Sequence, residues 1–407
     1  MRYRMTSKQH IMSPEYGHIS SGKALELEQK LLANSKKYQE LKNTGHPMKP
    51  VGISIAVTGR CNSHCIMCSI WRLWKENPDL INEEMSREEI LGYLKDPYLS
   101  DLIEIDLTGG EPHLREDLVD LIFGIVDLKQ TTLKKLKTII VPSNGYLTDK
   151  IIPRMERILA RLKGTGIDFV SVSSLDGIGK NHDIMRGTKG AFDKASRTIE
   201  GFMELRKRYA DFFLPGLKTT ITHYNVDELE GLLNFALKRN MFYIISSVII
   251  SKKRFRNEQY RDKLELNPED LKKIALFYEN RKMDLDFYYQ KIFETITAGK
   301  RQWICTALFN YLFIDYDRKV YPCPIQDVCV GDLSNSTISE VLTSKRAAAV
   351  RKNVGTYSLC QQCTEPGTVR YSQVMEGKAM LDFLKSKGRE HYKKMIFDKG
   401  LHKLLYI

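Results

Sequence analysis

Three cysteines stand close together near the start of the chain, and their spacing suits an iron–sulfur cluster. Cys61, Cys65 and Cys68 lie in the segment CNSHCIMC. A [4Fe–4S] cluster needs four ligands, so three thiolates would leave one iron open to a ligand from outside the protein. Zinc is an alternative, but structural zinc sites are usually closed by a fourth residue, and His64 is crowded between two of the cysteines. Three buried cysteines of an ordinary core are the remaining interpretation.

The other five cysteines form a second group far along the chain. They are Cys305, Cys323, Cys329, Cys360 and Cys363, and no cysteine lies between Cys68 and Cys305. The last two form a C-x₂-C pair, and 17 residues separate the first two. Four thiolates complete a site for zinc or for an iron–sulfur cluster, and the spacing alone does not separate the two.

Alternating strands and helices are expected to position these cysteines. Short apolar runs rich in β-branched residues predict strands over residues 53–57, 102–107, 137–141, 169–175, 217–222 and 242–250. Helices are predicted between them, over 86–93, 117–128, 149–162, 191–209 and 226–238. This alternation indicates βαβ units and a parallel sheet, with the active site at the C-terminal ends of the strands. It does not choose between a complete barrel, a partial barrel and a doubly wound sheet.

Unusual segments follow three more of these strands. Thr108-Gly109-Gly110-Glu111-Pro112 ends the second strand, VPSNG (141–145) ends the third, and SSLDG (173–177) ends the fourth and precedes HDIMRG (182–187). Two glycines let a backbone approach a ligand closely, and Glu111 adds a negative charge. Each segment alone also reads as a plain strand-to-helix turn.

In this order, the motifs resemble those of the radical S-adenosylmethionine (SAM) enzymes. Their C-x₃-C-x₂-C motif follows the first strand of a partial barrel, and Cys61, Cys65 and Cys68 match it fully. The resemblance covers about residues 51–250. It implies an α/β fold, a partial parallel (β/α)₆ barrel of the TIM type, in which these cysteines hold a [4Fe–4S] cluster whose open iron SAM chelates.

The resemblance also implies which residues contact SAM. The family's GGEP motif corresponds to Gly109, Gly110, Glu111 and Pro112. Its TNG turn corresponds to Asn144, with Ser143 where threonine is usual, and an S-x-D-G segment near the SAM ribose and carboxylate corresponds to Ser174.

The second cysteine group resembles the SPASM/twitch appendage of the same enzymes, an α+β cluster-binding domain. There a β-hairpin delivers a cysteine, here Cys323, although the family usually has glycine where this chain has Arg318. The resemblance implies that Cys305, Cys323, Cys360 and Cys363 hold an auxiliary [4Fe–4S] cluster. Cys329 is then spare and is expected to be a small buried side chain.

Five regions are expected along the chain. They are a helical leader (1–50), the radical SAM partial barrel (51–250), a helical linker region (251–302), the SPASM/twitch domain (303–370) and a basic helical tail (371–407). The tail is interpreted as a packing helix, and peripheral membrane contact through a helix lying on a membrane surface is the alternative.

Composition sets broad limits on the protein's class. The chain has 407 residues, of which 42% are hydrophobic and 28% charged, which excludes a disordered chain. A net charge of +13 fits an anionic partner, but no RNA-binding module is recognisable, so no nucleic acid is expected. Neither a signal peptide nor an apolar run of roughly 18 residues is present, which predicts a cytoplasmic protein with reduced thiols.

The sequence therefore predicts a radical SAM enzyme, an oxidoreductase or transferase. By resemblance, an external one-electron reductant of the flavodoxin or ferredoxin type drives cleavage of SAM to a 5′-deoxyadenosyl radical. That radical takes hydrogen from an unactivated carbon of a small-molecule, sugar or lipid-like substrate, and the auxiliary cluster assists an oxidation or carbon–carbon bond formation. A peptide-modifying maturase is an alternative, disfavoured because the leader is short for a peptide-recognition domain. A non-catalytic zinc-binding module is another.

Overall fold

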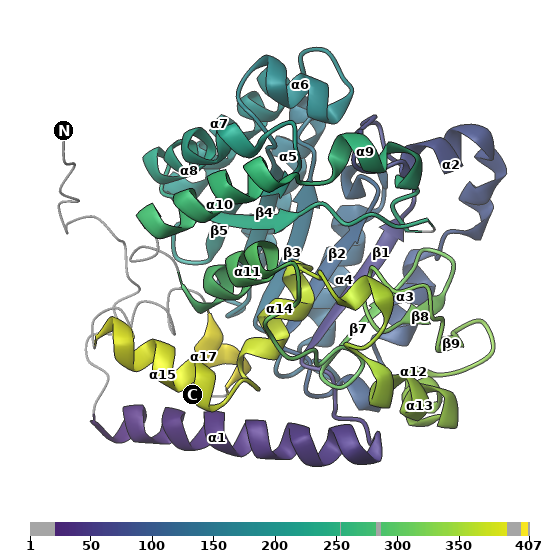
Figure 1. Ribbon diagram of the computed structural model, residues 1–407. Coiled ribbons are helices and arrows are strands. Elements are labelled where there is room, and N and C mark those ends of the chain that lie inside the picture. The colour runs from purple at the N-terminus through teal and green to yellow at the C-terminus, as the bar shows by residue number, and fades with distance from the viewer. Residues whose placement is uncertain (1–20, 253, 282–285, 389–399, 406–407) are drawn as a thin grey trace.

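One nine-stranded sheet organises the protein. The structure, a computed structural model, describes residues 21–252, 254–281, 286–388 and 400–405 (Figure 1). The strand order is β6-β5-β4-β3-β2-β1-β7-β8-β9. Pairings from β6 to β7 are parallel, and the last two are antiparallel. The six strands β1–β6, each followed by helical structure, form the predicted partial (β/α)₆ barrel.

All six predicted strands are confirmed. They are β1 (Gly52–Thr58), β2 (Glu104–Gly109), β3 (Thr138–Ser143), β4 (Asp168–Ser174), β5 (Phe213–Ile221) and β6 (Phe242–Ser247). The sequence prediction misses the first part of β5, because the pair Pro215-Gly216 is typical of a turn when it is considered alone. Here Gly216 lies under the Phe242 ring of β6, where an added Cβ would come within 2.1 Å of that ring.

Helices connect and cover the strands. Those of the barrel region are α2 (Ile70–Glu76), α3 (Arg87–Tyr93), α4 (Leu118–Leu128), α5 (Thr148–Leu162), α6 (Lys180–Arg186), α7 (Ala191–Tyr209) and α8 (Leu229–Lys238). The others are α1 (Ser21–Thr44), α9 (Arg261–Leu264), α10 (Pro268–Arg281), α11 (Phe287–Ala298), α12 (Ile338–Thr343), α13 (Lys345–Asn353), α14 (Pro366–Gln373), α15 (Lys378–Lys387) and α17 (Leu401–Leu404). A capping box of Ser86 and Glu89 opens α3, as its sequence predicts.

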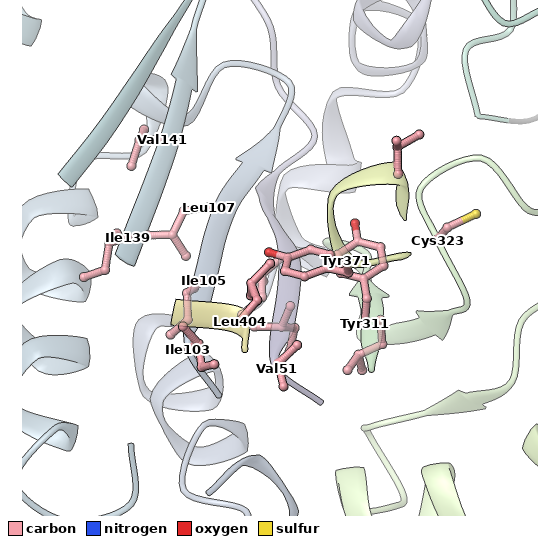
Figure 2. Close-up of a cluster of buried hydrophobic side chains, with 14 of the residues drawn as sticks. Val51, Ile103, Ile105, Leu107, Ile139, Val141, Tyr311, Cys323, Tyr371 and Leu404 are labelled. Atoms are coloured by element: carbon pink, nitrogen blue, oxygen red, sulfur yellow. The ribbon is translucent and has the colours of Figure 1, made fainter. Parts of the chain in front are cut away.

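Side chains alternate between the two faces of each barrel strand. On β2 and just before it, Ile103, Ile105 and Leu107 are buried in the hydrophobic core, which Figure 2 shows with Ile139 and Val141 of β3. The intervening residues Glu104, Asp106 and Thr108 line a cavity inside the barrel instead. The strand period thus separates a face buried in the hydrophobic core from a face that brings Glu104, Asp106 and Thr108 to the cavity.

The C-terminal part of the chain continues the barrel sheet. β7 (Tyr311–Ile314) runs parallel to β1 with Gly52 opposite Tyr311 and Ile55 opposite Ile314. β8 (Lys319–Tyr321) and β9 (Gly331–Asp332) then add antiparallel strands. The sequence indicated the hairpin but not its junction with β1, and the predicted domain boundaries stay a prediction.

Stacked tyrosines seal this junction. The Tyr311 and Tyr371 rings lie 4.9 Å apart at an interplanar angle of 18°, next to β1 (Figure 2). The Tyr371 ring covers Gly52 so closely that an added Cβ would lie 2.1 Å from its Cζ. Glycine is therefore required at this position by packing.

The hairpin turn between β7 and β8 forms despite the arginine that replaces the family's usual glycine. Arg318 takes a φ of +70°, a conformation that costs a non-glycine residue free energy. Its guanidinium donates to both carboxylate oxygens of Glu89, at 2.7 and 3.0 Å. This ion pair ties the turn to α3 and offsets the strain.

The predicted leader and tail pack against the protein. Leu27 and Leu31 of α1 are buried while Leu32 is half-exposed, and α1 contacts α13 and α15 (Figure 1). Met380 and Leu384 of α15 are buried as well, which supports the packing interpretation over a membrane-facing one for this helix. Residues 1–20 and 389–399, with tail side chains such as Met395 and Ile396, lie outside the described residues. Across the described ranges, no helix is long and apolar enough to cross a membrane.

Replacing Gly52 with alanine should destabilise the protein by about 1–3 kcal/mol, because the new methyl group meets the Tyr371 ring in a packed core. Gly92 in α3 is the matched control, since an added Cβ there meets nothing within 4 Å. Gly92→Ala should be neutral or stabilising by up to about 1 kcal/mol. Chemical unfolding curves measure both, and equal stability of the two variants would contradict this packing.

Candidate active site

The first cysteine group lies in the loop between β1 and α2, at the C-terminal end of the barrel. Cys61, Cys65 and Cys68 all line the large barrel cavity. The loop is held by backbone bonds to the end of α6: His64 N donates to Arg186 O at 3.1 Å, and Ile66 N donates to Met185 O at 3.1 Å. The predicted position of the three thiols after the first strand is confirmed.

The surroundings of Cys61 and Cys68 disfavour their thiolate forms in the absence of a nearby cation. Burial, followed by repulsion from the neighbouring Cys65 thiolate, raises the pKa of Cys61 and raises that of Cys68 to about 11. A bound metal centre would supply the positive charge that lets such thiols ionise. The donor set and its shared cavity therefore fit an iron–sulfur cluster.

The two glycines of the β2 motif allow a close approach of two backbones. Gly109 has a φ of +127°, and a Cβ on it would lie 2.0 Å from Thr58 O. A Cβ on Gly110 would lie 2.1 Å from Arg60 O. Both positions therefore demand glycine, and both line the cavity beside the cysteine loop.

Glu111 and Pro112 have a different place from the glycines. Both side chains are buried and neither lines the cavity. The Glu111 carboxylate accepts bonds from Asn144 N (2.7 Å), Ser143 Oγ (3.0 Å) and His113 N (3.2 Å). Glu111 thus joins the ends of β2 and β3 and acts here as a positioning group, while its predicted contact with SAM stays a prediction.

The other two predicted cofactor contacts do face the cavity. Asn144 donates from Nδ2 to Asn62 Oδ1 at 2.7 Å, which links the end of β3 to the cysteine loop. Ser174 ends β4 and lines the same space. Four predicted residues, Gly109, Gly110, Asn144 and Ser174, therefore line the same cavity as the three thiols.

Arg186 is a site residue that sequence reasoning noted but did not assign. Its Nη2 forms a 2.5 Å ion pair with Asp176, and its Nη1 lies 3.5 Å from Cys65 Sγ. Ser63 Oγ is 3.1 Å from the same sulfur. The only signal in the sequence was the RG pair after the fourth strand, which is weak by itself.

Four cysteines of the second group come together and the fifth stays apart. Cys305, Cys323, Cys360 and Cys363 are all buried. Burial raises the pKa values of Cys305, Cys323 and Cys363, and repulsion among the four thiolates raises them further. Cys329 is only partly buried, unlike the expectation, and its Sγ donates to Gly331 O at 3.2 Å.

Polar side chains surround the second group. Gln326 Nε2 donates to Cys360 Sγ at 3.3 Å, and the Trp303 indole donates to Cys363 O at 3.1 Å. Tyr38 of α1 donates to Cys305 O at 2.7 Å. Helix α1 therefore supports a cysteine more than 250 residues away, which no local pattern indicates.

Two cavities connect these features. The large one, of about 1550 Å³, runs from the cysteine loop down the barrel lumen and exceeds the roughly 300–1,000 Å³ of ordinary ligand pockets. A smaller one, of about 210 Å³, is lined by both glycines and by Cys323 and Gln326. The glycine segment thus lies between the spaces that serve the two cysteine groups.

A single metal ion and a four-iron cluster need differently spaced ligands. In the part of the chain that the structure describes, no three His, Cys, Asp or Glu side chains are placed to hold one metal ion. A four-iron cube binds each thiolate to a different iron, so its ligands stand farther apart than those around one zinc ion.

Family comparisons agree with this geometry. The model of the radical SAM superfamily matches residues 55–236, and the model of the SPASM iron–sulfur cluster-binding domain matches residues 305–364. The chain is therefore a member of the radical SAM superfamily with a C-terminal SPASM domain. These domains imply three kinds of cofactor: a radical SAM [4Fe–4S] cluster, auxiliary iron–sulfur clusters and SAM.

Individual relatives are enzymes of differing activity. The chain is 30% identical over 179 residues to Fe-coproporphyrin III synthase of Methanosarcina barkeri, which covers 44% of this chain but only 39% of that protein. It is 26% identical over 298 residues to a probable GTP 3′,8-cyclase of Sulfurisphaera tokodaii, covering 69% of this chain and 86% of the relative. Molybdenum cofactor biosynthesis protein moc-5 of Caenorhabditis elegans is 24% identical over 254 residues, covering 59% of this chain and 38% of that protein.

Glu111→Ala should lower the free energy of unfolding by about 2–4 kcal/mol, because it leaves buried N–H groups without an acceptor. Glu111→Gln keeps a carbonyl acceptor and should cost less. Unfolding curves under anaerobic conditions measure both. Unchanged stability with a loss of SAM affinity in equilibrium dialysis would show that Glu111 contacts SAM instead.

Proposed function

We propose that this chain is a radical SAM enzyme that activates an unreactive carbon–hydrogen bond of a small molecule. The observation that carries the proposal is the opening of three thiols and a glycine-rich strand end onto one cavity that continues into the barrel. Such a cavity can hold SAM at the cysteine loop and a substrate in the lumen beyond it.

Cys61, Cys65 and Cys68 are the proposed ligands of the first cluster. Gly109 and Gly110, packed against the backbone of Thr58 and Arg60, would form the wall beside SAM, and Asn144 and Ser174 offer polar contacts. With SAM bound, the cluster supplies a 5′-deoxyadenosyl radical, which removes hydrogen from the substrate. The residues of the chain hold and orient both molecules, and Glu111 keeps the ends of β2 and β3 in place.

Cys305, Cys323, Cys360 and Cys363 are the proposed ligands of the auxiliary cluster. Because four thiolates close a cluster, this site would exchange electrons rather than bind substrate. After hydrogen removal, this cluster would accept the unpaired electron of the substrate as the substrate loses a proton, and the net reaction would be an oxidation. A carbon–carbon bond would form if the substrate radical added to a second carbon instead. A cytoplasmic flavodoxin or ferredoxin would supply the electron that starts the reaction.

The relatives' names support a small-molecule substrate over a peptide. The name of the Methanosarcina barkeri relative contains a porphyrin, and that of the Sulfurisphaera tokodaii relative contains GTP. Both molecules are polar and contain rings. A zinc-binding module is disfavoured because residues 55–236 match the radical SAM superfamily, whose relatives include enzymes.

Replacing Cys61, Cys65 and Cys68 together by alanine should abolish 5′-deoxyadenosine formation. Anaerobically reconstituted wild-type protein should contain about eight irons per chain, and the triple variant about four. Chromatography of the products and iron analysis measure both quantities. Cys329→Ala is the matched control and should match the wild type in both. Turnover by the triple variant, or zinc in place of iron, would contradict the proposal.

Gln326→Leu should lower the reduction potential of the auxiliary cluster. An N–H donor to a ligand sulfur stabilises the more negative, reduced state. A hydrogen bond worth about 1 kcal/mol corresponds to a shift on the order of tens of millivolts for one electron. Gln361→Leu is the control, since its side chain donates to Thr356 O and not to a sulfur. Redox titration followed by electron paramagnetic resonance measures both, and equal potentials would contradict this contact.

A further inference from the structure

Two charged side chains face the barrel lumen from separate strands, with apolar residues between them. Asp106 lies on β2 and Lys218 on β5, and both line the large cavity. β3 and β4 stand between these strands in the sheet and line the cavity with Ile140, Val170 and Val172. The register continues this wall, with Asp106 opposite Ile140 and Ile140 opposite Val170.

Asp106 has one satisfied and one unsatisfied carboxylate oxygen. Oδ2 accepts a 2.8 Å bond from Ser54 Oγ, which itself accepts a 2.9 Å bond from the Tyr311 hydroxyl. Oδ1 is shielded from solvent and has no hydrogen-bond partner among the described residues. The pKa of this carboxyl is raised to about 7, mainly by burial; the Ser54 hydrogen bond and Lys218 lower it, and nearby Glu365 and Glu104 raise it. A buried, unpaired carboxylate oxygen in a cavity wall points to a missing hydrogen-bond donor.

Lys218 lacks the acidic partner that four other cations lining the cavity have among the described residues. Arg370 pairs with Glu104, Lys403 with Asp168, Arg186 with Asp176, and Arg254 with Asp315. Lys218 is partly buried, and within the described ranges it makes neither a hydrogen bond nor an ion pair. An ammonium group held in a cavity without a counter-ion favours an anionic ligand.

We propose that Asp106 and Lys218 are the two polar anchors of the substrate site. The substrate is then a small molecule with a hydrogen-bond donor, such as an amine, amide or hydroxyl, for Asp106 Oδ1. It also carries an anionic group, a carboxylate or phosphate, for Lys218. The carbon frame between these groups lies against Ile140, Val170 and Val172. This inference rests on the proposed function and narrows its substrate to a polar anion, which excludes a neutral lipid.

Fractionated cell extract tests the substrate class. The probes are three fractions of a peptide-free extract from the organism of origin: water-soluble molecules retained by an anion exchanger, water-soluble molecules not retained, and the organic-solvent fraction. Only the retained fraction should stimulate 5′-deoxyadenosine formation by the reduced, reconstituted protein. Treating that fraction with phosphatase separates the two anions, since the stimulation is lost for a phosphate and kept for a carboxylate.

Variants test the two residues. Lys218→Gln and Asp106→Asn should each raise the concentration of retained fraction needed for half-maximal stimulation by about tenfold or more, as expected for loss of a charge-assisted contact. Lys218→Arg should retain most of the response. Lys272→Gln, a surface change on α10 with a 77% exposed side chain, is the matched control and should behave like the wild type.

Three results would overturn the inference while leaving the proposed function intact. They are stimulation by the unretained or organic fraction, no stimulation by any fraction although SAM is still cleaved, and a Lys218→Gln variant that loses SAM affinity rather than response to the fraction. The last is a real alternative, because Lys218 stands opposite Ser174 in the sheet. Failure of wild-type protein to cleave SAM at all would instead contradict the proposed function. Circular dichroism and iron content confirm that each variant is folded and loaded.

Discussion

The parallel pairing of β7 with β1 is the contact on which the arrangement of the two cysteine groups depends. It places the SPASM hairpin beside the strand that carries the first cysteine loop, although the paired residues Gly52 and Tyr311 are 259 positions apart in sequence. The stacked rings of Tyr311 and Tyr371 seal the pairing, and Gly52 makes room for them. One sheet therefore carries both the strand that leads into the first cysteine loop and the hairpin that leads to Cys323.

The strand period gives the barrel its second essential property. Successive residues alternate between the hydrophobic core beneath the helices and the lumen, so polar groups enter the cavity without disturbing the core. Most of the lumen's charges are neutralised in pairs, such as Arg370 with Glu104 and Lys403 with Asp168. Unpaired polar atoms are then costly unless a ligand meets them, which makes Asp106 and Lys218 informative.

Sequence patterns within short segments predicted the features of the fold and the site that depend on those segments alone. β-branched apolar runs located all six barrel strands, and the three-cysteine spacing and Gly109-Gly110 located the loop and strand end that face the cavity. Contacts across the sheet were not accessible in this way. Three such contacts depend on the register between strands that are far apart in the sequence. They are the burial of Glu111 between the ends of β2 and β3, the approach of Arg186 to Cys65, and the placement of Asp106 and Lys218 in one cavity. β7, only four residues long, gave too short a signal to predict its partner.

The central claim is that one cluster has an open iron for SAM and the other is closed by four thiolates. Electron paramagnetic resonance of the reduced, reconstituted protein with and without SAM tests it most directly. SAM should change the signal of one cluster only, and the triple variant of Cys61, Cys65 and Cys68 should retain a single signal that SAM leaves unchanged. A signal in that variant that responds to SAM, or a wild-type protein in which SAM changes neither signal, would contradict the account.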